Sequence, residues 1–140
     1  MAKHKKQKPE DDRATVLRFS NAHLWVRADA DRAQIGISDQ GQDSLGEIIA
    51  VEFPDVGDAI EKGEAFGELE SVRTVHELIA PVTGTVSAVN GELENQPSLA
   101  NEDPYHEGWL IEVELADENE LEDLMATEDY EEYVAGRDED

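Results

Sequence analysis

The chain has 140 residues, no cysteine and a formal net charge of −24 at pH 7. This length suits one domain, the lack of cysteine excludes disulfides, thiol nucleophiles and thiolate metal sites, and the charge disfavours nucleic acid and anionic membranes as partners. There is no run of eighteen apolar residues and no apolar stretch after the basic start, so we expect neither a membrane span nor a secretory signal. A cytoplasmic protein fits these features. The acidity indicates a solubility device, attraction of a basic partner or a salt-adapted host.

The two ends of the chain differ in composition from its middle. Residues 1–14 hold a basic block, then an acidic one, with few apolar residues, and we expect a disordered charged tail there. Residues 135–140 are also too polar to pack, so we expect an acidic disordered tail. The single folded domain is then expected over residues 15–134.

Between these tails, apolar and polar residues mostly alternate, as is typical of β-strands. Strands are expected at residues 24–28, 33–37, 46–53, 65–71, 75–80, 84–89 and 109–115. Glycine-containing and acidic turn sequences separate several of them. One helical turn is expected at residues 40–45.

A helix is otherwise expected only near the C-terminus. Asp117 and Glu120 have the spacing of an N-cap and its capping box. Leu121, Leu124 and Met125 then follow at helical spacing, which indicates a stripe that packs on the core.

One apolar pattern occurs twice. A glycine, an aliphatic residue two positions later and a valine three positions after that occur at residues 46–51 and again at 84–89. A repeated pattern indicates duplicated supersecondary units. Two copies of short strands predict a pseudo-twofold sandwich or flattened barrel.

The stretch GELESVRTVHELIAPVTG, residues 67–84, predicts a hairpin with Arg73 near its tip. The string ESV-x-x-V-x-x-L-x-x-P-V-x-G-x-V within it resembles the lipoyl-bearing hairpin of the glycine cleavage system H protein family. Further matches, in the family's order, lie at residues 23–26, 35–37, 43–48, 51–58, 89–90, 101–105 and 108–111. The resemblance covers about residues 19–134.

This resemblance implies a mostly β fold, a lipoyl-domain-like barrel-sandwich hybrid with short C-terminal helices. It implies a carrier and not an enzyme. In the family, a lipoylated lysine takes an aminomethyl group from glycine decarboxylase, offers it to the aminomethyltransferase and is reoxidised by dihydrolipoyl dehydrogenase. That lysine lies three residues after the hairpin glutamate, Glu70 here, so its position is Arg73, and Glu70, Ser71 and Val72 are the matching recognition residues.

Arginine at this position changes the chemistry. Lipoylation needs a neutral amine, which lysine can supply when it loses its proton. A guanidinium stays protonated in proteins and its lone pairs are delocalised. Lys62, the only lysine of the expected domain, lies in another turn with Ala59 in place of an acid three residues earlier. We therefore predict no lipoyl cofactor.

A second departure lies on the first matching strand. The family usually reads Ser-His-Glu-Trp there, and this chain reads Ala22-His23-Leu24-Trp25. The resemblance makes Ala22 and Leu24 positions of the pocket that lodges the loaded arm. A carboxylate and a hydroxyl are both replaced by apolar groups, so a protonated amine would lose its counter-charge.

Other chemistry finds little support in the sequence. The four histidines lack ligand spacing, so no metal site is expected, and no carboxylate pair or serine motif indicates catalysis. Trp25 and Trp109 are expected in the core.

The sequence favours a monomeric, non-lipoylated binding or regulatory paralogue of the H protein. Its expected partners are lipoyl-handling enzymes, namely glycine decarboxylase, aminomethyltransferase, dihydrolipoyl dehydrogenase or a lipoyl ligase. The alternative is a functional aminomethyl carrier of glycine cleavage whose lysine is altered in this sequence.

Overall fold

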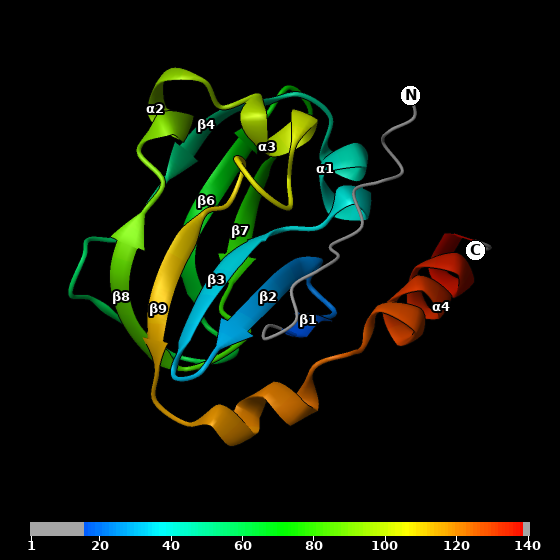
Figure 1. The fold of residues 1–140 in the computed structure, drawn as a ribbon. Coiled ribbons are helices and arrows are strands. Elements are labelled where there is room, and N and C mark those ends of the chain that lie inside the picture. The colour runs from blue at the N-terminus through cyan, green and yellow to red at the C-terminus, as the bar shows by residue number, and fades with distance from the viewer. Residues whose placement is uncertain (1–15, 139–140) are drawn as a thin grey trace.

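The fold consists of two antiparallel sheets packed face to face, as seen in a computed structural model that describes residues 16–138 (Figure 1). The six-stranded sheet contains, in spatial order, β1 (Val16–Phe19), β2 (Leu24–Asp29), β3 (Arg32–Ile37), β9 (Ile111–Leu115), β8 (Gly84–Val89) and β5 (Ala59–Ile60). The three-stranded sheet contains β4 (Ile48–Glu52), β6 (Ala65–Ser71) and β7 (Val75–Ile79). The mostly β sandwich predicted from the alternation is confirmed.

Short helices connect and cover the strands. They are α1 (Asp39–Leu45), α2 (Glu92–Asn95), α3 (Leu99–Glu102), the 3₁₀ helix η2 (Glu118–Asp123) and α4 (Thr127–Asp138). The expectation of helix only near the C-terminus, apart from one turn at 40–45, was wrong, because α2 and α3 occupy the segment between β8 and β9. Helix α4 runs to Asp138 and so passes the boundary expected after residue 134. The tail expected at residues 1–14 lies outside the described residues.

The main core lies between the two sheets. The repeated pattern contributes one buried aliphatic residue to each, Ile48 on β4 and Val86 on β8, both about 1% exposed. The two copies therefore belong to opposite layers of the sandwich, which is consistent with the predicted arrangement. Burial of such side chains against each other is the main stabilising contribution to a sandwich of this kind.

A second, aromatic cluster attaches α4 to the six-stranded sheet. Tyr130 of α4 stacks on Phe19 of β1, with ring centroids 4.4 Å apart. Trp25 is fully buried beside them, and its indole nitrogen donates to the carbonyl of Pro104 at 2.9 Å. Gly36 lies opposite Trp25 in the β2–β3 register, and a Cβ there would come within 2.5 Å of the indole ring. Trp25 is thus a core anchor, as predicted, and Trp109 packs on the same cluster.

The expected C-terminal helix is only partly confirmed. Asp117 is the N-cap of η2, since its side chain accepts from the Asn119 N–H at 2.9 Å. The predicted capping box was wrong, because the Glu120 carboxylate does not bond back to the N-cap. It accepts instead from the backbone N–H and the hydroxyl of Thr83. The helical spacing predicted for Leu121, Leu124 and Met125 was also wrong. The 3₁₀ helix ends at Asp123, and Leu124 is already extended. The three apolar residues still pack on the core, Leu121 and Leu124 on the main cluster and Met125 on the aromatic one.

Candidate functional site at the β6–β7 hairpin tip

A buried serine builds the turn between β6 and β7. Its backbone N–H donates to the carbonyl of Thr74 at 2.8 Å. Its hydroxyl accepts from the N–H groups of Arg73 and Thr74, at 3.1 and 3.2 Å. Ser71 is 5% exposed. Ser71, one of the predicted recognition residues, therefore stabilises the turn itself. Its hydroxyl satisfies two backbone donors that the turn would otherwise leave unpaired.

Arg73 lies against the end of helix α1. Its guanidinium Nη1 donates to the carbonyl of Ser44 at 2.7 Å. A Cβ added to Gly46, the C-cap of α1, would lie 3.2 Å from Arg73 Nε. The last turn of α1 has no basic residue of its own, and its final carbonyls carry partial negative charge. Arg73 thus supplies the cation and the donor that this helix end lacks.

Two further contacts fix the segment beside the tip. The Val72 N–H donates to the carbonyl of Glu47 at 2.9 Å. Asn101 of α3 donates to the carbonyl of Gly46 and accepts from the Ile48 N–H, both at 2.9 Å. Ser44 and Glu47 were not predicted as part of this site, because they contribute only backbone carbonyls. Asn101 lies within the family match at residues 101–105, without a predicted role.

The remaining side chains of the tip face solvent. Val72 is 61% exposed and Val75 is 55% exposed, with Ile49 of β4 at 45% close by in the same sheet. Glu70 is also exposed, and it forms no ion pair with any residue between 16 and 138. The tip therefore combines a fixed backbone with exposed apolar and acidic side chains.

The two predicted pocket positions lie near the other end of α1. Leu24 is fully buried in the main core, opposite Ile37, so its side chain has no exposed surface in this conformation. Ala22 is half-buried. The Nδ1 atom of the neighbouring His23 shares a hydrogen bond of 2.7 Å with the Tyr130 hydroxyl. That hydroxyl shares a second hydrogen bond, also of 2.7 Å, with the Ser38 hydroxyl. A role of Ala22 and Leu24 toward a lipoyl arm stays a prediction.

The described lysine is engaged elsewhere. Lys62 Nζ lies 2.6 Å from Asp123 Oδ2. The hydrogen bond to Asp123 raises the pKa of Lys62, so the ammonium form is favoured further. Lys62 thus forms an exposed ion pair with η2, away from the β6–β7 tip, and its lack of modification stays a prediction.

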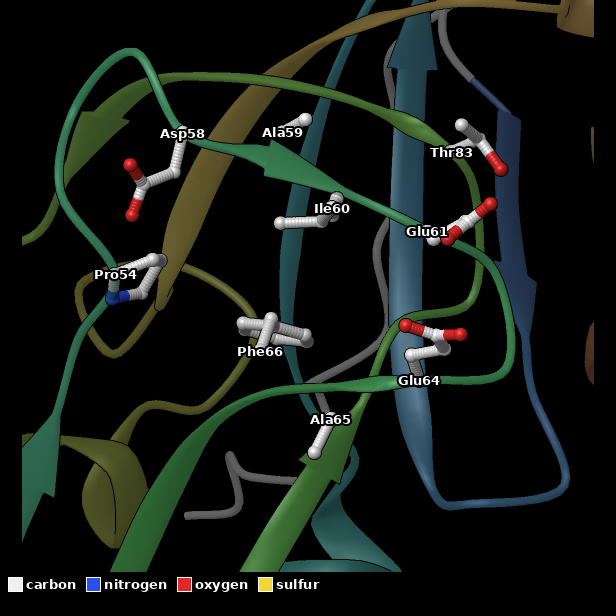
Figure 2. A pocket seen from close by; sticks show the side chains of 9 residues that line it. All are labelled: Pro54, Asp58, Ala59, Ile60, Glu61, Glu64, Ala65, Phe66 and Thr83. Carbon is white, nitrogen blue, oxygen red and sulfur yellow. The ribbon is translucent and has the colours of Figure 1, made fainter.

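An open pocket lies near the opposite end of β6 (Figure 2). Its volume is about 470 Å³. Ile60 and Phe66 lie in its middle, with the carboxylate of Asp58 on one side and those of Glu61 and Glu64 on the other. Ala65 and Phe66, the first two residues of β6, line it, and the tip follows Ser71 at the other end of this strand, a span of roughly 15 Å. Within residues 16–138 no group of three histidines or carboxylates is placed to hold a metal ion.

Comparison with known proteins decides the family. The model of the glycine cleavage H-protein family matches residues 17–137. The chain belongs to this family. It is 52% identical over 118 residues to the glycine cleavage system H protein of Brevibacillus brevis, covering 84% of this chain and 94% of the relative. It is 46% identical over 119 residues to that of Halalkalibacterium halodurans, covering 85% and 93%.

The solved structures agree with this assignment. The crystal structure of a glycine cleavage system H protein from Mycobacterium marinum superposes with a TM-score of 0.79 at 29% identity, covering 85% of this chain and 96% of the other. The predicted family and the lipoyl-domain fold are confirmed. H proteins are carriers and not enzymes themselves, as expected for this chain. Among the described residues, no helix is long and apolar enough to cross a membrane.

Proposed function

We propose that this chain is an H-protein-like docking module that carries no lipoyl group and binds enzymes that handle lipoyl domains. The observation that carries the proposal is the position and contact of Arg73. The motif resemblance assigns Arg73 the hairpin position of the family's lipoyl-lysine, and its guanidinium donates to the Ser44 carbonyl.

The chemistry of Arg73 supports this proposal in two ways. A guanidinium has no free lone pair with which to attack an activated acyl group. In addition, the guanidinium of the exposed Arg73 already has a structural contact, because its Nη1 donates at 2.7 Å to the Ser44 carbonyl at the end of α1. Lys62 offers no substitute, because it lies in another turn, where it pairs with Asp123.

The retained scaffold supports docking as the function. The turn made by Ser71 and the exposed Val72 keep the shape of a hairpin that a lipoyl-handling enzyme could bind. Proposed partners are glycine decarboxylase, aminomethyltransferase, dihydrolipoyl dehydrogenase or a lipoyl ligase, all in the cytoplasm. By occupying such an enzyme without delivering an arm, the chain would regulate it or hold it in place.

The decisive experiment is intact mass spectrometry after expression with a lipoyl ligase and lipoate. The natural sequence should gain no lipoyl group. The Arg73→Lys variant should gain one, because the turn and Glu70 are already in place and a surface change of this kind usually costs within about 0.5 kcal/mol. The control is Arg73→Gln, which removes the bond to Ser44 without providing an amine.

Two outcomes would contradict the proposal. A lipoyl group mapped to any residue of the natural sequence would favour the alternative, a working aminomethyl carrier. A folded Arg73→Lys variant that is never lipoylated would show that the ligase does not bind this hairpin, and that the partner lies outside lipoate metabolism.

A further inference from the structure

The outer face of the three-stranded sheet carries two adjacent rows of side chains. In the register of β4, β6 and β7, Glu52 lies opposite Glu68, and Glu68 lies opposite Glu77. Two residues nearer the tip, Ala50 lies opposite Glu70, and Glu70 lies opposite Val75. Because side chains alternate across a strand, positions two apart share a face, so both rows belong to one surface.

The first row places three like charges side by side. We call Glu52, Glu68 and Glu77 the glutamate ladder. Directly opposite residues have their Cβ atoms about 5 Å apart, and like charges at that spacing are destabilising. Glu52 and Glu77 are exposed and Glu68, on the central strand, is partly exposed. None of them forms an ion pair with a residue in the described part of the chain.

The second row continues into exposed apolar side chains at the hairpin tip. We call Ile49, Val72 and Val75 the apolar tip, and all three are at least 45% exposed. Large aliphatic side chains gathered on one exposed surface are typical of interaction sites. Val75 shares the face of the ladder, because it lies two residues before Glu77 on β7, and Ile49 and Val72 are exposed next to it at the tip end of the sheet.

From this face we infer that the outer surface of β4, β6 and β7 is the docking surface, and that its occupant is a protein surface with lysine or arginine side chains beside an apolar depression. This inference rests on the proposed function and deepens it, since it says which surface binds the enzyme. Charge complementarity selects the occupant. A cationic surface would relieve the repulsion within the ladder, whereas a second copy of this chain would bring another net charge of −24.

The test measures binding of the full-length chain to each of the four purified enzymes named above. The ladder variant is Glu52→Gln/Glu68→Gln/Glu77→Gln. Its control is Glu92→Gln/Glu107→Gln/Glu122→Gln, three exposed glutamates outside this sheet whose replacement changes the net charge equally. We expect the ladder variant to bind about tenfold or more weakly, mainly through slower association, and the control to stay within about twofold.

The apolar tip has its own matched pair. Val75→Ser should raise the dissociation rate several-fold, because the loss of a buried apolar contact acts mostly on complex lifetime. Val56→Ser is the control, since Val56 is 61% exposed but lies outside the three strands.

Thermal unfolding at low salt provides a measurement without any partner, and the ladder variant should unfold at a higher temperature than its control because the repulsion is removed.

Each contrary outcome has a distinct meaning. If an enzyme binds the natural sequence and both triple variants bind it equally more weakly, net charge and not this face drives association. The inference then fails while the proposed function stands. The same holds if the ladder variant binds as tightly as the natural sequence. A dimer in sedimentation that the ladder variant disrupts would make a second copy the occupant and overturn the inference. If none of the four enzymes binds the natural sequence, the proposed function fails and the inference falls with it.

Discussion

On the six-stranded sheet the glutamates of β9 have a cationic neighbour, whereas on the three-stranded sheet the glutamates of the ladder have none among the described residues. Arg32 of β3 lies 3.2 Å from Glu112 Oε2 and 3.9 Å from Glu114 Oε2. The aromatic cluster and α4 pack at the β1–β2 end of the six-stranded sheet. The outer face of the three-stranded sheet carries the exposed side chains of Glu52, Val75 and Glu77.

The two sheets therefore differ in how their solvent-facing acids are partnered. On the six-stranded sheet Arg32 lies within reach of Glu112 and Glu114, which are themselves partly exposed. On the outer face of the three-stranded sheet, the ladder glutamates form no ion pair with a described residue and lie beside the exposed Val75. The first sheet has the features of a scaffold and the second those of a recognition surface. Four predictions test this distinction, from the largest expected effect to the smallest.

Truncation of Trp25 should have the largest effect on the free energy of unfolding. Trp25→Ala removes a fully buried ring and its bond to Pro104, and should lower the free energy of unfolding by about 3–5 kcal/mol. Val75→Ala, on the exposed sheet, should change it by less than about 0.5 kcal/mol. Denaturant unfolding with both variants is the measurement. Similar losses would mean that the apolar tip is as important to stability as the aromatic cluster.

High pH should weaken the aromatic cluster through its tyrosines. Burial raises the pKa of Tyr105 to about 12, from an ordinary value of 10. Because folding raises this pKa, the stabilisation is complete below pH 10 and is lost as the pH rises from 10 toward 12. The loss is on the order of 2 kcal/mol for this group. Tyr105→Phe should flatten the stability profile in that window, and an unchanged slope would contradict the assignment to Tyr105.

Removal of the Ser71 hydroxyl should loosen the hairpin tip. Ser71→Ala leaves the Arg73 and Thr74 N–H groups without their acceptor and should cost about 1–2 kcal/mol. Ser87→Ala on the six-stranded sheet is the control, because it removes one hydroxyl bond, to the Glu112 carbonyl. Hydrogen exchange at residues 71–75 should quicken in the first variant only. Equal exchange in both would show that the turn does not depend on this hydroxyl.

Single charge removals should have opposite signs on the two sheets. Glu68→Gln should stabilise the protein by a few tenths of a kcal/mol, because it relieves the repulsion in the ladder. Glu112→Gln should destabilise it by a similar amount, since exposed ion pairs contribute about 0.2–1 kcal/mol. Both effects should shrink at high salt. Effects of the same sign would remove the electrostatic contrast between the sheets.

The strands that carry the candidate site could be predicted from sequence because their alternation is long and their turn is polar. The hairpin was expected at residues 65–71 and 75–80 and forms at Ala65–Ser71 and Val75–Ile79. Pairing within it follows from the turn, so Glu68 opposite Glu77 was predictable in principle. Glu52 completes the ladder from a strand outside the hairpin, and no local pattern specifies that register, which includes an irregularity after Ile48.

Elements of few residues were missed for a simple reason. Strand β1 has four residues, β5 has two, and α2 and α3 have four each, too few to show a period. Arg73 was located from its motif, but its partner Ser44 lies 29 residues earlier in the chain and contributes only a carbonyl. A backbone acceptor has no residue signature, so only the folded chain reveals the contact.

Helix α1 has a consequence for the order in which the chain folds during synthesis. It spans seven residues, too few for a helix to persist alone. Its C-terminal end is held by Arg73, and the hydroxyl of its N-cap Ser38 is held by Tyr130, 92 residues later. At 5–20 residues per second the ribosome needs on the order of 10 s to make that interval. During that interval α1 lacks its contact with Tyr130, so α4, the last helix of the described residues, completes α1, the first one.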